Sequence, residues 1–158
     1  MKAKSIKGKS TEEIQSGLRE SMADGFKPTI AIVFISVKQD REAISGLLEE
    51  KGIQIFGATT AGEFIDGEME GGSIVMLLLD MNPAYFKLEF LETSQDTAFK
   101  DAIKHGNTGK ETFTNPAFII ANSGVTLDGE PFVEGIIQGF GKHPSSEDEE
   151  VTIFGGKA

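Results

Sequence analysis

Apolar positions recur along the chain with two different spacings, one helical and one extended. After Ser10, a mostly polar segment carries Ile14 and Leu18 four residues apart, which predicts an amphipathic helix. Ser10 is the expected N-cap, with Glu13 as its capping-box partner, and Gly25 suits the C-terminal end.

The segments that follow predict a strand, a helix and a second strand. Residues 29–36 (TIAIVFIS) are almost continuously apolar and β-branched, which is typical of a strand covered on both faces. A helix is expected over about 40–51, with Gly52 as its stop, and a short strand over 53–56. A helical connection of this kind suits a parallel crossover between the two strands.

The rest of the chain continues the alternation. An apolar strand is expected within 72–81, and the alternating segment at 86–90 predicts an antiparallel neighbour for it. The remaining predicted elements are a helix over about 95–105 capped by Ser94, a polar loop over 106–114, a strand over 116–122, a helix beginning near Pro131 and a strand over 151–154. No internal repeat is evident. The predicted fold class is α/β, with a mixed, largely parallel central sheet flanked by helices and one antiparallel hairpin.

Small, glycine and hydroxyl residues follow the predicted strands at their carboxyl ends, where open α/β sheets bind ligands. We expect these segments to meet and to line one polar pocket. The candidate ligand-binding residues are Ser36, Gly57, Thr59, Thr60, Gly62, Glu63, Asn122, Ser123, Gly155 and Gly156. Free backbone N–H groups suit an anionic or zwitterionic ligand, and Glu63 is the expected acceptor for a ligand ammonium. A glycine after a strand is also what an ordinary tight turn needs.

Length and charge limit the classes of protein that fit. A chain of 158 residues is expected to form a single domain with a substantial core. The 15 basic and 25 acidic residues give a net charge of −10, which disfavours nucleic acids and anionic membrane surfaces as partners. No signal peptide or long apolar run is present, so we expect a cytoplasmic protein that does not enter a membrane.

Patterns for catalysis and metal binding are weak. The absence of cysteine excludes thiolate chemistry, and neither His105 nor His143 stands at a catalytic spacing from a serine or aspartate. Asp128-Gly129-Glu130 has the pattern of a turn and not of a calcium loop. We therefore expect no catalytic residues, no metal and no cofactor. The enzymatic alternative is a hydrolase or transferase that uses Ser123 or a threonine as nucleophile and Glu63 as base.

Three segments of the chain resemble the FIST domain, a sensory module of intracellular signal-transduction proteins. Residues 32–36 are similar to its hydrophobic strand that ends in a small residue, and residues 55–63 (IFGATTAGE) to its Gly-x-Ser/Thr-Thr-Ala-Gly-Glu signature. Residues 151–158 (VTIFGGKA) resemble its Gly-Gly-x-Ala ending. The resemblance covers about residues 28–158. It implies a non-catalytic module that binds a small ligand, an amino acid or small carboxylate, and signals to an output domain.

The resemblance extends only to the N-terminal half of that module, so we expect the C-terminal half to be absent from this chain. Ligand binding would then change the packing between the two halves. An apolar surface left by the absent half would favour self-association into a homodimer. A scaffold or dimerisation domain without any ligand is the remaining alternative.

Overall fold

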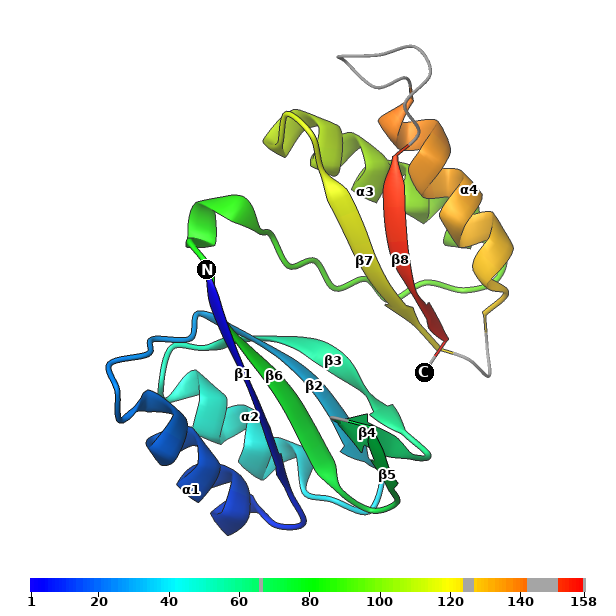
Figure 1. The fold of residues 1–158 in the computed structure, drawn as a ribbon. Coiled ribbons are helices and arrows are strands. Elements are labelled where there is room, and N and C mark those ends of the chain that lie inside the picture. Colours follow the sequence, from blue (N-terminus) through cyan, green and yellow to red (C-terminus); the bar gives the residue numbers. More distant parts are fainter. Residues whose placement is uncertain (66, 124–126, 142–150, 158) are drawn as a thin grey trace. The chain divides into compact units, whose positions relative to one another are not determined.

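The computed structural model describes residues 1–65, 67–123, 127–141 and 151–157. The chain divides into two compact units, Met1–Leu88 and Glu89–Ala158. Figure 1 shows that helices pack on a sheet in each of them. The expectation of a single domain stays a prediction.

The first unit contains a four-stranded mixed sheet. In sheet order its strands are β1 (Lys2–Gly8), β6 (Ile74–Asp80), β2 (Ile30–Ser36) and β3 (Gln54–Thr60). β2 and β3 run parallel, as the crossover predicted, whereas β6 runs antiparallel to both β1 and β2. The α/β class with a mixed sheet and flanking helices is confirmed, with more antiparallel ladders than the pattern predicted.

Helices α1 (Thr11–Met22) and α2 (Arg41–Glu49) form as the periodicity predicted, because each has a polar residue that satisfies its first N–H groups. Ser10 Oγ accepts from the Glu13 N–H at 3.3 Å, and Asp40 Oδ1 accepts from the Ala43 N–H at 3.0 Å. Gly52 follows α2 with a φ of 68°, which glycine adopts at little cost.

The core of the first unit lies between these two helices and one face of the sheet. Its members are apolar side chains from α1, α2, β1, β2, β6 and the segments that join them, and those without any exposure are Ile14, Leu18, Ala31, Leu48, Ile74 and Leu78. Full burial of one aliphatic side chain the size of leucine contributes about 1.5–3 kcal/mol. This layer therefore supplies much of the stability of the unit.

Two strand predictions are wrong in the first unit. The segment after Phe56 is not a loop: β3 continues through Gly57 to Thr60, because it stays paired with β2 as far as Ser36. The segment at 86–90 is not a strand, because β6 already has β1 on one edge and β2 on the other.

The antiparallel hairpin of the structure lies elsewhere in the chain. It consists of β4 (Glu63–Ile65) and β5 (Glu68–Glu70), with Gly67 at a φ of 85° in the turn between them. After β6, a short 3-10 turn η1 (Pro83–Tyr85) leads toward the second unit.

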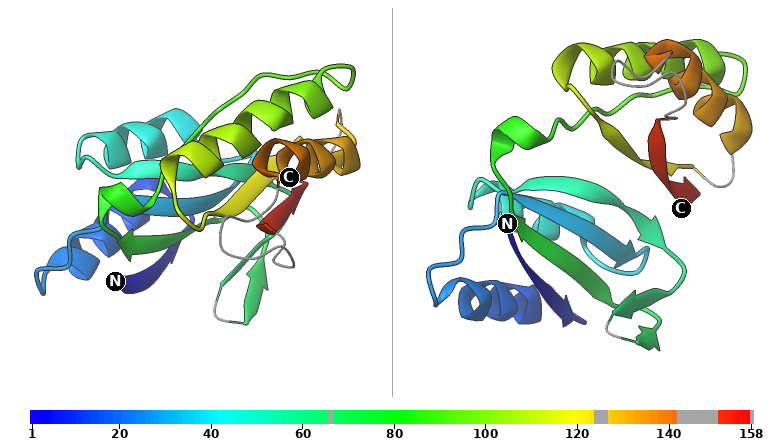
Figure 2. Two further views of the ribbon diagram at one scale, coloured as in Figure 1. Left: turned by 90° about the horizontal axis from the view of Figure 1, so that it is seen from above. Right: turned by 45° about the horizontal axis from the view of Figure 1, so that its top comes forward.

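The second unit is a parallel strand pair with two helices. β7 (Ala117–Asn122) and β8 (Thr152–Lys157) run parallel, and Figure 2 shows α3 (Ala98–Thr112) and α4 (Gly129–Phe140) side by side. Both helices bury apolar residues against the same side of the pair, where Phe118, Ile120 and Ile153 lie. The expected loop after residue 154 is wrong, because β8 extends through Gly155 and Gly156.

Helix α3 is longer than predicted, so the polar loop expected at 106–114 is wrong. Gly106 and Gly139 let the two helix backbones touch: a Cβ atom would lie 2.3 Å from the Ile136 oxygen at Gly106 and 2.1 Å from the Ile103 oxygen at Gly139. This contact stabilises a helix that glycine alone would weaken.

The cap of α3 also differs from the prediction. Thr97, not Ser94, is the N-cap residue, and the backbone oxygen of Ser94 accepts from the Ala98 N–H at 2.8 Å. No helix in the described ranges is both long and apolar enough to cross a membrane.

Candidate functional site

The carboxyl ends of β2 and β3 meet at one edge of the first sheet. Ser36 and Thr60 are register partners there. Ser36 is buried, and its N–H donates to the backbone oxygen of Ser73 at 3.0 Å. The Gln39 side chain donates to the Gly72 oxygen at 2.7 Å. This edge is therefore tied to the start of β6 by polar groups of the chain itself.

Glu63 stands at the centre of this edge, with only 1% of its surface exposed. Thr60 Oγ1 donates to Oε1 at 2.7 Å, and the Ser73 N–H and hydroxyl donate to Oε2 at 3.0 and 3.1 Å. Burial alone would raise the pKa of the Glu63 carboxyl, but hydrogen bonds from Thr60 and Ser73 outweigh burial and lower it. The Glu63 carboxylate on β4 thus joins Thr60 of β3 to Ser73, the residue directly before β6.

The other signature residues of the first unit have different surroundings. A Cβ atom on Gly57 would lie 2.0 Å from the Val33 oxygen, so glycine is required for the close approach of β3 to β2. Thr59 is half-buried on the strand, and Gly62 is exposed with open space where a Cβ would point. The roles expected for these residues in ligand binding stay predictions.

The second unit contains a cavity of about 440 Å³ at the carboxyl ends of its strand pair. β7 contributes Ile120 and Asn122 to its wall, and β8 contributes Ile153, Phe154, Gly155 and Gly156. The first turns of α4 close the other side with Gly129, Glu130, Val133 and Glu134. Three of the predicted site residues, Asn122, Gly155 and Gly156, therefore line one cavity.

Two glutamates of this cavity, Glu130 and Glu134, were missed from the sequence. They lie four residues apart on α4, so both project from the same face of the helix, next to apolar walls. The available signal was Asp128, which caps α4 by accepting from the Glu130 N–H at 3.3 Å. Because α4 begins at Gly129, its first turns carry Glu130 and Glu134 next to the ends of β7 and β8. The turn that the sequence predicted at residues 128–130 would not place them there.

The predicted residues thus gather in two sets, one at the end of each parallel pair. Ser36 and the signature residues 57–63 form the first set. Asn122, Gly155 and Gly156 form the second with Ser123, which is exposed and whose backbone oxygen accepts from Leu127. The expectation that both sets line one common pocket stays a prediction.

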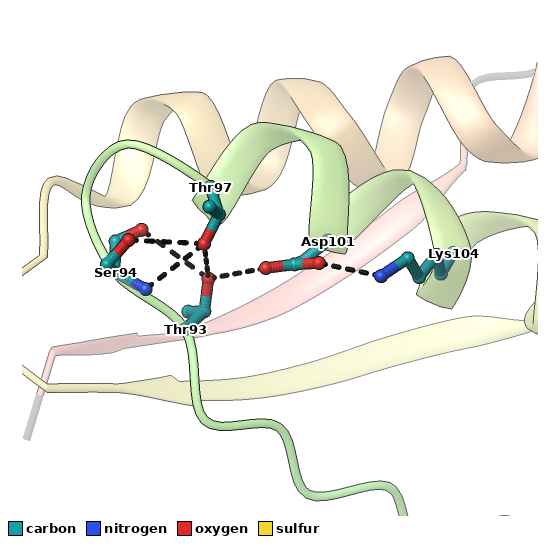
Figure 3. Close-up of polar contacts among 5 residues, drawn as sticks. All are labelled: Thr93, Ser94, Thr97, Asp101 and Lys104. Atoms are coloured by element: carbon teal, nitrogen blue, oxygen red, sulfur yellow. Dashed lines mark hydrogen bonds and ion pairs between the residues drawn. The ribbon is translucent and has the colours of Figure 1, made fainter.

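A separate polar cluster lies at the start of α3 (Figure 3). Thr93 Oγ1 donates to Asp101 Oδ2 at 3.0 Å, Lys104 donates to Asp101 Oδ1 at 2.8 Å, and Thr97 Oγ1 lies 3.0 Å from Thr93 Oγ1. The Lys104 ammonium and the Thr97 and Thr93 hydroxyls lower the pKa of Asp101 from 3.8 to about 2. These groups bond to one another and connect the segment before α3 to the first turns of the helix.

His105 lies within α3, which continues to Thr112. Its Nδ1 pairs with Glu89 Oε2, and its ring contacts Phe132 with centroids 6.1 Å apart. A second cavity of about 320 Å³ borders this pair. His143, Gly124 and Ala158 lie outside the described residues.

Within the part of the chain that the structure describes, no three acidic or histidine side chains are arranged to hold a metal ion. In comparisons with known proteins, the family model described as the FIST N domain matches residues 29–158. No curated protein and no solved structure matches the chain. The matched range includes β2, β3, β7 and β8, and hence both sets of predicted residues.

Proposed function

The chain belongs to the FIST N domain family, and from that premise we propose that it is a non-catalytic sensor of an amino acid with an apolar side chain. Family membership supports a sensory role in signal transduction. The observation that carries the choice of site is the cavity between the ends of β7 and β8 and the first turns of α4. Its volume of about 440 Å³ lies within the roughly 300–1,000 Å³ typical of small-molecule pockets.

The lining of this cavity favours a ligand that carries an ammonium group. Glu130 and Glu134 are like charges one helical turn apart, which destabilises α4 by about 0.2–0.5 kcal/mol unless a cation lies near them. Ile120, Val133 and Ile153 offer apolar surface for a side chain, and the Asn122 amide suits the ligand carboxylate. A small dicarboxylate without an ammonium would be repelled by both glutamates.

The alternative of hydrolysis with a threonine and Glu63 is disfavoured by the surroundings of that carboxylate. Glu63 is bonded to Thr60 but is 1% exposed, and its lowered pKa makes it a weaker base. We therefore propose that the sensor is non-catalytic. We also propose that it works in the cytoplasm and passes ligand binding to a C-terminal half or output domain, through differential affinity for two packing states.

Thermal unfolding in the presence of candidate ligands tests this proposal. At about 100 times its dissociation constant, an apolar amino acid should stabilise the protein by about 2.7 kcal/mol and raise Tm by about 5–10 °C. The double variant Glu130→Gln/Glu134→Gln should lose most of that rise. The matched control, Glu42→Gln/Glu49→Gln on α2, removes the same charge from residues that do not line the cavity and should keep the rise.

Two results would contradict the proposal. Stabilisation by dicarboxylates but not by amino acids would reject the ligand class, and no stabilisation by any amino acid would reject sensing at this cavity.

A dimerisation domain is the second candidate, because one side of the β7–β8 pair is apolar and open. Ile119 is 54% exposed and Phe154 is 58% exposed. Light scattering of wild type and the Ile119→Ser/Phe154→Ser variant separates the candidates. A dimer lost in the variant, together with no response to amino acids, would favour dimerisation.

A further inference from the structure

The cavity between the ends of β7 and β8 and the start of α4 has a charged side and an apolar side. On α4, Glu130 and Glu134 are exposed. Phe132 and Ile136 of the same helix are buried in the core of the second unit. At 3.6 residues per turn, Val133 lies between these two faces of α4, and it is half-buried and lines the cavity. The helix side of the cavity therefore changes from charged to apolar at Val133.

The strands continue the apolar side of the cavity. Ile120 of β7 and Ile153 of β8 line it and also pack against the buried core, so truncating either of them would open a hole in that core. Gly155 has a φ of 129°, and a Cβ atom there would lie 1.9 Å from the Ile120 oxygen. Alternation along β8 places the Phe154 side chain on the face opposite to Ile153, where it is 58% exposed. Val133 lies at the edge of the core, so its size can change at a smaller cost in packing.

We propose that Val133 determines how long a side chain the ligand of this cavity can carry. This role rests on the proposed function, in which Glu130 and Glu134 bind the ammonium group of an amino acid. With its ammonium at the charged edge, the ligand places its side chain on the apolar side, next to Val133. The aliphatic lining there has no polar atom in its side chains, so discrimination depends on size. One methylene in an apolar pocket changes affinity about 10–200-fold.

Isothermal titration calorimetry with the free amino acids alanine, leucine and phenylalanine tests this role. The readout is the ratio of the dissociation constants of two ligands for the same protein. Val133→Ala removes atoms from the wall, so it should shift the ratio for phenylalanine and leucine at least about tenfold in favour of phenylalanine. Val133→Leu adds a methylene to the wall, so it should shift the ratio for leucine and alanine at least about tenfold in favour of alanine.

The matched control is Ile137→Ala, because Ile137 is an apolar residue of the same helix that is 49% exposed and does not line the cavity. This variant should keep both wild-type ratios. Val133→Thr keeps the size of the side chain and should keep them as well, which separates size from polarity. Thermal unfolding of each protein without ligand shows that it is folded, and the smaller and the larger variant test the role of Val133 independently.

Opposite shifts in Val133→Ala and Val133→Leu support the proposal. Wild-type ratios in both variants would overturn the role of Val133 while leaving the proposed function intact. A change by the same factor for all three amino acids would also overturn it, because Val133 would then contact the part that these ligands share. If the wild-type protein bound none of the three amino acids, the proposed function would fail, and the role of Val133 with it.

Discussion

A buried carboxylate destabilises a fold unless donors surround it, and Glu63 meets that condition. Thr60 supplies one hydroxyl, and Ser73 supplies a second hydroxyl and a backbone N–H, which together outweigh the effect of burial on the pKa of Glu63. In this structure the glutamate of the signature segment therefore connects strands. A ligand ammonium would have to compete with these donors to reach it.

Replacing Glu63 by glutamine should destabilise the first unit. The side-chain amide of the variant can accept from one side only, and its NH₂ group would face either the Thr60 or the Ser73 donors, so we expect a loss of about 1.5–3 kcal/mol. Urea unfolding measures this loss. The pKa of Glu63 is below its usual 4.5, so its contribution to stability is full above that pH and is lost as the pH falls further.

The Glu63→Gln variant should accordingly lack this part of the acid dependence. Unchanged stability in the variant together with lost amino-acid binding would instead assign Glu63 to the ligand, as the sequence predicted.

At the scale of elements, glycines decide how closely α3 and α4 pack. Gly46 in α2 has no atom within 4 Å of its missing Cβ, whereas at Gly139 in α4 a Cβ would lie 2.1 Å from the Ile103 oxygen. Gly46→Ala should stabilise the protein by about 0.5–1 kcal/mol, because alanine favours helix. Gly139→Ala should destabilise it by about 1–3 kcal/mol, because the helices must move apart.

Thermal unfolding of the two variants measures both changes. If Gly139→Ala stabilised the protein as Gly46→Ala does, helix propensity, and not the contact between α3 and α4, would determine the effect at Gly139.

The polar cluster at the start of α3 predicts an acid-sensitive helix. The pKa of Asp101 is lowered from 3.8 to about 2, so its contribution is present above pH 3.8 and is lost as the pH falls toward 2. Asp101→Asn should remove this part of the acid dependence. Far-UV circular dichroism melts between about pH 5 and about pH 2 measure it. A wild type whose helix signal does not weaken below pH 3.8 would contradict the prediction.

At the scale of the whole molecule, the first unit has a core of its own. Every residue of its main apolar cluster lies between Ile6 and Leu78. A protein of residues 1–88 should therefore unfold cooperatively on heating, as small single domains do. Matching exchange protection of residues 30–36 in this fragment and in the full chain is the measurement. A fragment without a cooperative transition would show that the first unit depends on the second.

Patterns confined to one segment predicted most of the elements. The helices α1, α2 and α4 and the strands β2, β6 and β7 follow from local periodicity, caps and apolar runs. β1 was missed because only Ile6 is a buried large side chain in the sequence KAKSIKG. Its place is decided by the ladder with β6, which is far away in the chain.

The sequence also predicted only part of the candidate site. Asn122, Gly155 and Gly156 were expected because strand ends are visible in the sequence, and the structure places them in the wall of a cavity. Glu130 and Glu134 were missed because the start of α4 determines which way they project. The burial of Glu63 depends on Ser73, which comes from another strand connection.

The sequence by itself determined the α/β class, the order of most elements and the signature segments that carry the family relationship, because these depend on the spacing and identity of neighbouring residues. Only the tertiary structure decided that Gly57 and Gly155 lie within strands, that Gly106 lies within a helix, and which carboxylates are buried or line a cavity. Those properties depend on backbones and side chains that meet across long chain separations. A local sequence pattern does not show which distant segment of the chain will pack against it.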